Sequence, residues 1–128
     1  FVGVSTFLDG IATTAGMRLG DTECAGRHVL PVADGAPVRG ALRAEQIRIG
    51  PINSALTGCD TALTGHVADM IFEGERLLYI IRSDALPGAE IQIYHHDPAA
   101  FELFEAGAEI RFGWQAADLK IFKRNQQD

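Results

Sequence analysis

The sequence lacks both glycine-rich signatures of nucleotide binding. Its only two lysines, Lys120 and Lys123, do not follow a glycine, and no G-x-G-x-x-G run is present. A phosphate-binding loop needs glycines that let the backbone wrap the phosphates, and an adjacent lysine that reaches them. We therefore expect no nucleotide hydrolysis by this chain.

Signatures of nucleophilic catalysis are missing as well. There is no G-x-S-x-G segment, and Ser5, Ser54 and Ser83 stand in no recognisable motif. Cys24 and His28 lie four residues apart, a spacing at which strand geometry does not bring a thiol and its base together. These absences predict that the chain is not an enzyme.

Cysteine is scarce and long apolar runs are absent. Cys24 and Cys59 are far apart and form no CxxC pair, which argues against a structural zinc site. Two small buried thiols fit this pattern, with a disulfide between them as the alternative. The longest apolar run, Leu77–Ile81, is far too short to cross a membrane.

The chain also has fewer positive than negative charges. The 11 lysines and arginines stand against 17 aspartates and glutamates, which gives a net charge of −6. An acidic surface repels phosphate backbones and anionic lipids, and no basic stripe with interleaved aromatic residues is present. We expect no nucleic-acid partner and no direct insertion into a membrane.

The sequence does contain short apolar stretches that alternate with polar residues. Ile110, Phe112 and Trp114 fall on one face of such a stretch and Arg111 on the other. Trp114 could stack on a base or a sugar, but this alternation favours a place in the core. We expect strands at Val38–Arg43, Ile47–Ile49, Leu77–Ile81, Ile91–Tyr94, Ile110–Trp114 and Leu119–Phe122, and turns at Gly20-Asp21, Asp34-Gly35, Gly50-Pro51, Glu73-Gly74 and Pro87-Gly88. This spacing predicts one all-β domain, a sandwich or a barrel.

A weak internal repeat supports an all-β fold. Residues 38–49 can be laid over residues 110–121, so that apolar residues match at the outer strand positions and Arg39 matches Arg111. Each copy has the pattern strand, tight turn, strand. Upstream of each copy lies one Gly-led strand, at residues 9–12 and 64–67. Two similar units that close on each other would remove exposed sheet edges.

Two polar groups have competing interpretations. His95-His96-Asp97 could place two imidazoles and a carboxylate on one metal ion. Adjacent strand residues point to opposite faces, so a solvated strand end followed by a helix cap at Asp97 is favoured. Glu45 and Asp118 sit in the two matching turns and could act as paired acid and base. Turn residues of this type usually bond nearby backbone amides, so we expect neither a metal site nor a catalytic pair.

Four segments, in order, resemble the TOBE domain that follows the ATPase domain in subunits of ABC importers. Residues 1–10 resemble the segment that enters this domain. Residues 42–49 resemble its Arg-Pro-Glu turn, with alanine at the proline position. Residues 65–74 resemble its Gly-x-Val strand and aromatic-x-Gly turn, and residues 104–118 its closing Phe-x-x-Gly-x-x-Val and Trp-x-x-x-Asp segments. The motif residues carried over are Arg43, Glu45, Gly65, Gly74, Gly107, Trp114 and Asp118.

Within the family, the sequence most resembles the branch that imports polyamines, ferric iron or similar small solutes. The resemblance implies an OB-like or MOP-like β-barrel over residues 1–128. It would be built from two similar β-units with at most one or two short helices. The domain would be accessory and regulatory, would contact a second copy of the subunit, and would reach the permease through the longer protein. ATP and magnesium would bind in a domain upstream of Phe1, which we interpret as a cut within a longer chain. This domain would hold no cofactor and would lie at the cytoplasmic face of the cell membrane.

A second function remains open. Barrels of this kind can bind oxyanions such as molybdate in pockets at subunit contacts. Such a site needs backbone amides and a few Ser, Thr or Lys groups that converge. Thr13, Thr14 and Ser54 are the candidates in this sequence. A third interpretation, an OB-type binder of single-stranded nucleic acid, is disfavoured by the acidic charge.

Overall fold

The computed structural model describes residues 5–74, 76–95 and 103–124. These residues form strands joined by turns, and two 3-10 turns of three residues each are the helical elements among them. The elements are β1 Ser5–Ala12, β2 Gly16–Leu19, β3 Thr22–Ala25, β4 Arg27–His28, β5 Pro37–Arg43, η1 Ala44–Gln46, β6 Arg48–Pro51, β7 Thr61–Glu73, β8 Arg76–Arg82, β9 Ile91–His95, β10 Glu109–Trp114, η2 Ala116–Asp118 and β11 Lys120–Lys123. The expected all-β fold with little helix is confirmed.

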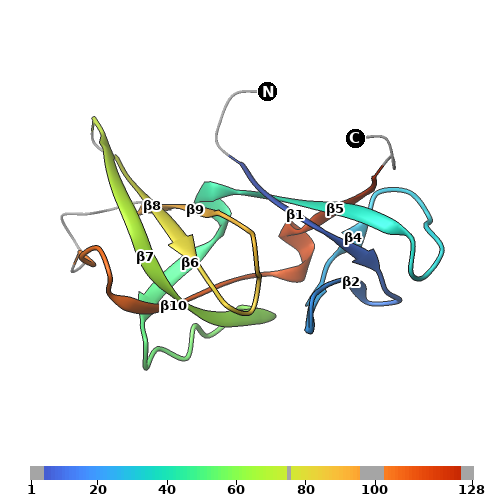
Figure 1. Cartoon of the computed structure of the whole chain (residues 1–128), viewed down its shortest axis with the longest axis horizontal. Coiled ribbons are helices and arrows are strands. Elements are labelled where there is room, and N and C mark those ends of the chain that lie inside the picture. Colours follow the sequence, from blue (N-terminus) through green and yellow to red (C-terminus); the bar gives the residue numbers. More distant parts are fainter. Residues whose placement is uncertain (1–4, 75, 96–102, 125–128) are drawn as a thin grey trace.

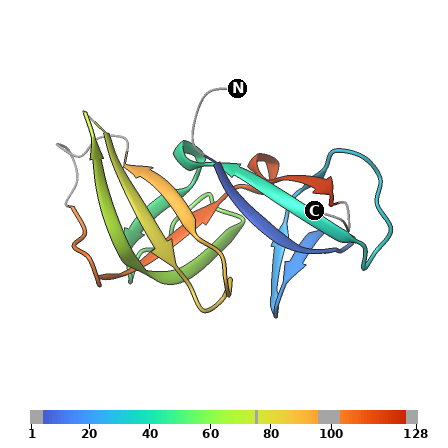
Figure 2. The same cartoon turned by 45° about the horizontal axis from the view of Figure 1, so that its top comes forward.

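The strands form two curled sheets that lie at opposite ends of the molecule (Figures 1 and 2). Sheet A has the order β3-β2-β1-β5-β11-β4, and sheet B has the order β9-β8-β7-β10-β6. The first five strands of sheet A correspond one to one with those of sheet B. In each sheet the last of these five strands comes from the other half of the chain, so the two halves exchange a strand.

The internal repeat expected from the sequence is present in the structure. The segment β5–η1–β6 corresponds to β10–η2–β11, and both have the form strand, 3-10 turn, strand. The strand registers also correspond, because Gly10 pairs with Val38 in sheet A as Gly65 pairs with Ile110 in sheet B. The repeat therefore describes a pseudo-symmetric fold and not a chance similarity of strands.

Strand β8 is buried on both faces, as its unbroken apolar run indicated. Leu77, Tyr79 and Ile81 point into the main core between the sheets. Leu78 and Ile80 point the other way, into a second cluster with Ala44 and Tyr94. The 3-10 turn that contains Ala44 thus covers the outer face of sheet B at this strand.

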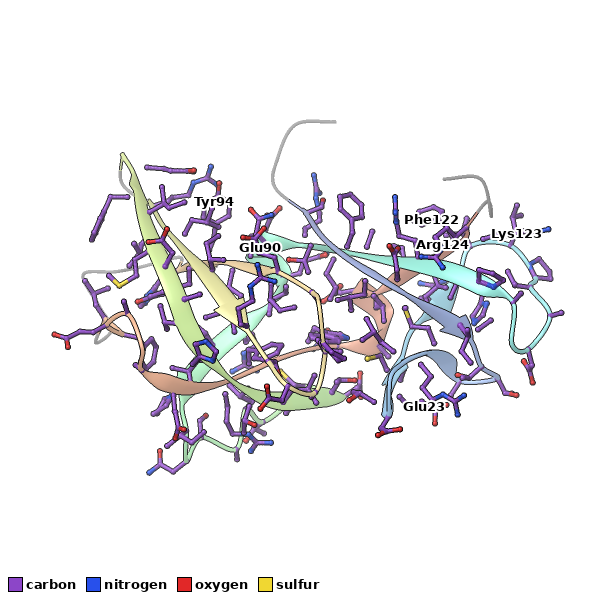
Figure 3. All side chains as sticks on the ribbon, viewed as in Figure 1. Glu23, Glu90, Tyr94, Phe122, Lys123 and Arg124 are labelled. Carbon is purple, nitrogen blue, oxygen red and sulfur yellow. The ribbon has the colours of Figure 1, made fainter. Side chains whose placement is uncertain are left out.

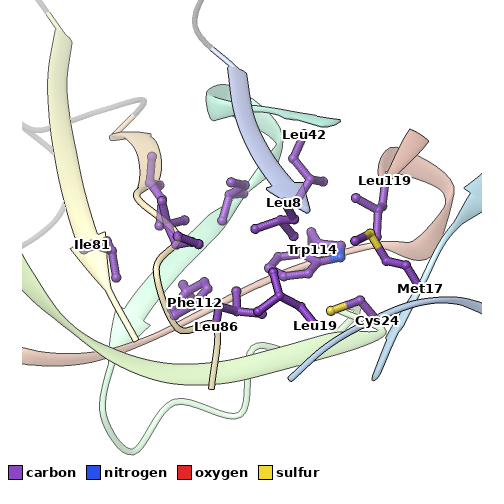
Figure 4. Close-up of a cluster of buried hydrophobic side chains, with 14 of the residues drawn as sticks. Leu8, Met17, Leu19, Cys24, Leu42, Ile81, Leu86, Phe112, Trp114 and Leu119 are labelled. Atoms are coloured by element: carbon purple, nitrogen blue, oxygen red, sulfur yellow. The ribbon is translucent and has the colours of Figure 1, made fainter. Parts of the chain in front are cut away.

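The main core lies where the two sheets meet, and Trp114 is at its centre (Figure 4). Trp114 is 1% exposed and packs beside Phe112, with ring centroids 6.2 Å apart. Met17, Leu19 and Cys24 approach the indole from sheet A. The alternation in residues 110–114 predicted this inward face correctly.

Several turn predictions are confirmed and one is wrong. Gly20, Gly35, Gly74 and Gly88 all have positive φ angles, which glycine adopts without the steric cost of a side chain. The expected turn at Gly50-Pro51 is instead part of β6, which pairs with β10. Proline is tolerated there because β6 is an edge strand of sheet B.

Within the described residues, no helix is long and apolar enough to cross a membrane. The helix cap that we expected at Asp97 lies outside the described residues.

Candidate functional site

The two matching 3-10 turns meet at the junction of the sheets. Gln46 at the end of η1 donates from Nε2 to Oδ1 of Asp118 at the end of η2, at 3.4 Å. The Oε1 atom of Gln46 also accepts a hydrogen bond from the backbone N–H of Arg43 at 3.3 Å. One amide side chain therefore closes its own turn and joins it to the other, and this is a structural role.

Arg43 and Glu45 form an ion pair on the rim of the first turn. The Nε atom of Arg43 lies 3.5 Å from Oε1 of Glu45, and both side chains are well exposed. Exposed pairs of this kind contribute little free energy. Asp118 accepts a hydrogen bond from the opposite turn, whereas Glu45 forms its ion pair with Arg43 of its own turn. The two carboxylates thus have structural partners that fit the turn interpretation.

Gly65 is required by a close approach of strands. A β-carbon at this position would lie 2.7 Å from the carbonyl oxygen of Arg82 and 3.1 Å from the Phe112 ring. Gly74 and Gly107 have positive φ angles of 62° and 88°. All three motif glycines therefore serve the backbone path.

Trp114 belongs to the core, as its alternation with Ile110 and Phe112 predicted. Its indole N–H is buried and has no hydrogen-bond partner in the described part of the chain. The second turn is instead closed by Asp60, whose Oδ2 accepts a hydrogen bond from the backbone N–H of Ala116 at 2.7 Å.

The histidine cluster is placed differently from our expectation of a solvated strand end. His95 is 6% exposed, because it lies beside the ring of Tyr79, with its Nδ1 atom 3.4 Å from the Tyr79 hydroxyl. The same hydroxyl accepts a hydrogen bond from the backbone N–H of Phe104 at 3.0 Å. His96 and Asp97 lie outside the described residues, and no group of metal-ligating residues occurs in the part that the structure describes.

Both cysteines are free thiols, so the disulfide alternative is wrong. Cys24 is buried and Cys59 is half-buried. Burial raises the pKa of the Cys24 thiol to about 11, and the charge of Glu23 adds to this shift. A thiol with so high a pKa is a poor nucleophile at neutral pH.

Two open hollows lie at equivalent places in the two halves of the fold. In sheet A, Ile11 pairs with Arg18, and in sheet B, His66 pairs with Arg82 at the corresponding point. Each of these residue pairs lines one hollow. The two arginines show no recognisable correspondence in the sequence, because the spacing between equivalent residues changes along the repeat.

The sheet A hollow contains two of the candidate hydroxyls, on Thr13 and Thr14, together with Arg18. Thr13 Oγ1 accepts a hydrogen bond from the backbone N–H of Gly16 at 3.1 Å, and Thr14 Oγ1 donates to Oδ2 of Asp34 at 3.1 Å. Two carboxylates, those of Asp34 and Glu23, also line this hollow. The Thr14 hydroxyl thus already donates its hydrogen bond to Asp34, and a bound anion would have to compete for this donor.

The sheet B hollow combines cationic, acidic and hydroxyl groups. The row Glu109, His66 and Arg82 crosses three neighbouring strands in register. Arg82 donates from Nη1 to the carbonyl oxygen of Ala89 at 3.2 Å. Ser83, also at the edge of the hollow, donates its hydroxyl to the carbonyl oxygen of Thr64.

Ser54, the third candidate hydroxyl, closes a local turn in the connection between β6 and β7. Its Oγ accepts a hydrogen bond from the backbone N–H of Leu56 at 3.2 Å, and its carbonyl oxygen accepts one from Nη1 of Arg111 at 2.9 Å. Ser54 lines neither hollow, whereas the two threonines line the sheet A hollow. The three candidates therefore do not form one site.

Comparison with known proteins connects these features to a family. No curated protein matches the sequence. A solved structure of ModG, described as a cytoplasmic molybdate-binding protein and crystallised with molybdate bound, has a similar fold with a TM-score of 0.58. The match has 22% sequence identity and covers 70% of this chain but only 64% of that one, so it shows the fold alone. The TOBE domain family matches residues 40–122, about two thirds of the sequence, and the chain belongs to this family.

Proposed function

We propose that this TOBE domain is a non-catalytic module that binds a small ligand, with oxyanions such as molybdate as the ligand class. The observation that supports this proposal is the similarity of its fold to a protein described as molybdate-binding. The two equivalent hollows are the candidate sites, because each offers one arginine on an open sheet surface. A guanidinium group with nearby hydroxyls is a common way to hold an oxyanion.

The charges around the arginines limit how an oxyanion could bind. Glu23 and Asp34 oppose Arg18, and Asp84 and Glu109 oppose Arg82 and His66. An anion in either hollow would be repelled by these carboxylates unless donors from outside the hollow offset them. We therefore expect weak binding by a single copy and stronger binding where a neighbouring molecule supplies further donors.

Isothermal titration calorimetry with sodium molybdate tests the proposal, with sodium sulfate as the second oxyanion. We expect saturable heat, weakened at least about tenfold by Arg18→Ala or Arg82→Ala, since each removes a charge-assisted hydrogen bond. The matched control is Arg76→Ala, because Arg76 lies over the Tyr94 ring and outside both hollows. Flat titrations with both oxyanions at millimolar concentration would overturn this function.

A second candidate function is that of an accessory domain in the ATP-binding subunit of an ABC importer for small solutes. The segments that resemble such domains support it, because their residues build the two joined turns, at β5–η1–β6 and at β10–η2–β11. In this function the domain is not an enzyme. Its partners are a second copy of the subunit and, through the longer protein, the permease at the cytoplasmic face of the membrane.

The coding sequence upstream of Phe1 tests the importer candidate directly. An open reading frame with a phosphate-binding loop and an ABC signature segment would support it. A start codon immediately before Phe1 would overturn it and leave ligand binding as the remaining candidate. A phosphate-release assay with ATP on this chain should give no signal above the blank in either case.

A further inference from the structure

The sheet B hollow contains charges of both signs. Arg82 and His66 lie directly opposite each other on β8 and β7, and Glu109 lies opposite His66 on β10. Residues that pair directly on antiparallel strands point to the same face of a sheet, so these three side chains form one row in the hollow. A second carboxylate, that of Asp84, follows β8 and lines the hollow as well.

The opposite charges in this hollow do not neutralise each other. His66 separates Arg82 from Glu109, which places their Cα atoms two strand spacings apart, roughly 10 Å. Within the part of the chain that the structure describes, no ion pair involves Arg82, Asp84 or Glu109. Each of these charges is therefore available to a ligand group of the opposite sign.

Arg82 is held in place by a hydrogen bond that leaves most of its donors available. Its Nη1 atom donates to the carbonyl oxygen of Ala89 at 3.2 Å, which uses one of the five N–H groups of a guanidinium. The Ser83 hydroxyl donates to the carbonyl oxygen of Thr64 and accepts a hydrogen bond from the backbone N–H of Ala85 at 3.2 Å. Ser83 thus ties the end of β8 to β7, and the guanidinium remains as the main donor for an anionic group.

The sheet A hollow is arranged differently. Arg18 lies directly opposite Glu23 on the edge strand β3, and the carboxylate of Asp34 already accepts a hydrogen bond from Thr14. Figure 3 shows Glu23 at this outer edge of sheet A, and Glu90 just before β9 in sheet B. Glu23 lines the sheet A hollow, whereas Glu90 does not line the sheet B hollow. The sheet B hollow is therefore the better candidate for a ligand with two charged groups.

The size and the charges of the sheet B hollow define the class of ligand. Its volume is about 240 Å³, below the roughly 300–1,000 Å³ of pockets that hold drug-sized ligands, so it suits a molecule of a few non-hydrogen atoms. Asp84 and Glu109 repel an oxyanion that carries no positive group. A ligand with one group of each sign avoids this repulsion and is selected over a simple oxyanion.

We propose that the sheet B hollow binds a small zwitterion, whose oxyanion group contacts Arg82 and whose ammonium group contacts Asp84 and Glu109. Both contacts are charge-assisted hydrogen bonds, which are stronger than neutral ones. The imidazole of His66 lies between the two ends of the ligand and offers a further hydrogen bond. The inference rests on the proposed function, because it gives an oxyanion group to the same arginine and adds the ammonium group as a requirement for tight binding.

An NMR titration of the ¹⁵N-labelled chain at pH 7 tests the proposal with taurine and ethanesulfonate. Taurine carries an ammonium group that ethanesulfonate lacks, and both carry the same sulfonate. We expect taurine to bind at least about fivefold more tightly, because each exposed charge pair adds up to about fivefold. Taurine should also shift the amide signals of His66, Arg82 and Glu109. Sodium molybdate, titrated in the same way, tests the proposed function alone.

Two variants assign the contacts to the two ends of the ligand. Arg82→Ala should weaken both ligands at least about threefold, because both sulfonates use the guanidinium. The double variant Asp84→Asn, Glu109→Gln should weaken taurine and strengthen ethanesulfonate, so that the preference between them disappears. Glu105→Gln is the matched control and should change neither affinity, because Glu105 is an exposed carboxylate outside the hollow. The NMR spectrum of each variant shows directly whether it is folded.

Equal affinities for taurine and ethanesulfonate would overturn the inference. A preference for taurine that survives in the double variant, or signal shifts confined to sheet A, would overturn it as well. If molybdate binds in any of these cases, the proposed function stands without the inference. Taurine binding without molybdate binding would support the inference and exclude the simple oxyanion. No shift with any of the three ligands at millimolar concentration would overturn both.

Discussion

Gln46 donates a hydrogen bond from Nε2 to Oδ1 of Asp118, and these two residues occupy equivalent positions in the two halves of the fold. Each is the last residue of a 3-10 turn, which joins the strand that stays in its own sheet to the strand that crosses to the other. The contact therefore lies on the pseudo-two-fold axis that relates the sheets. Two carboxylates at this distance would repel each other, and the amide of Gln46 avoids this repulsion because it donates to Asp118.

The Gln46–Asp118 contact should be measurable as a coupling. We expect Gln46→Ala and Asp118→Ala each to lower the free energy of unfolding by about 1 kcal/mol, as for a partly buried hydrogen bond. The double variant should lose less than the sum of the two, by about 0.5 kcal/mol or more, because the residues are in contact. Urea unfolding of the four proteins gives this cycle, and strictly additive losses would show that the contact contributes nothing.

Equivalent glycines should be equally intolerant of a side chain. A β-carbon at Gly10 would overlap the carbonyl oxygen of Arg18, and one at Gly65 would overlap that of Arg82. We expect Gly10→Ala and Gly65→Ala each to destabilise the fold by roughly 2 kcal/mol, because backbone must shift to relieve the overlap. Thermal unfolding followed by circular dichroism measures both. A variant that unfolds at the wild-type temperature would show that its sheet separates easily at that point.

The two thiols should differ sharply in reactivity. With Ellman's reagent at pH 8, Cys59 should react quickly and Cys24 only as fast as the protein opens, because Cys24 is buried. In the variant Cys59→Ser the fast phase should vanish. A fast phase that persists in that variant would mean that Cys24 is accessible.

The Cys24 thiol also predicts a pH dependence. Its pKa in the folded protein is about 11, against 9.0 for an unperturbed thiol. A raised pKa gives a contribution to stability that is fully present below about pH 9 and is lost as the pH rises toward 11. Cys24→Ala should therefore flatten the alkaline end of a stability profile measured by urea unfolding. The variant Cys59→Ser is the control, and its alkaline profile should follow that of the wild type.

Asp9 predicts the opposite behaviour in acid. A hydrogen bond from Arg39 lowers the pKa of Asp9 below its usual value of 3.8, and the charges of Arg39 and Arg124 add to this effect against weak burial. Its contribution to stability is therefore present above about pH 4 and is lost as the pH falls through the lowered pKa. The variant Asp9→Asn should lose stability at pH 7 but little at pH 2. Equal losses at both pH values would contradict the ion pair.

Much of the fold could be predicted from local pattern. Alternation of apolar and polar residues fixed the inward face of Trp114 and its neighbours, and the matching spacing of residues 38–49 and 110–121 indicated the two units. The exchange of strands between the halves could not be predicted. Pairing of β11 with β5, and of β6 with β10, joins segments far apart in the sequence, and alternation specifies a face but not a partner.

The candidate sites were harder to predict than the fold. Arg18 and Arg82 are equivalent in three dimensions, but more residues separate Arg82 from Gly65 than separate Arg18 from Gly10. The cause is the hairpin of β7 and β8, whose strands are longer than those of β1 and β2. The burial of His95 depends on Tyr79 and on the chain near Phe104, which lie on other segments. Burial by residues from distant segments cannot be predicted from the local sequence.

The exchange of strands has a consequence for how the chain folds as it leaves the ribosome. Strand β11 lies between β5 and β4 in sheet A, so this sheet stays incomplete until residues 120–123 have been synthesised. Until then β5 exposes an unpaired edge, which invites pairing with other nascent chains. We expect sheet A to close only after β11 has left the ribosome, with chaperones protecting the edge of β5 in the interval.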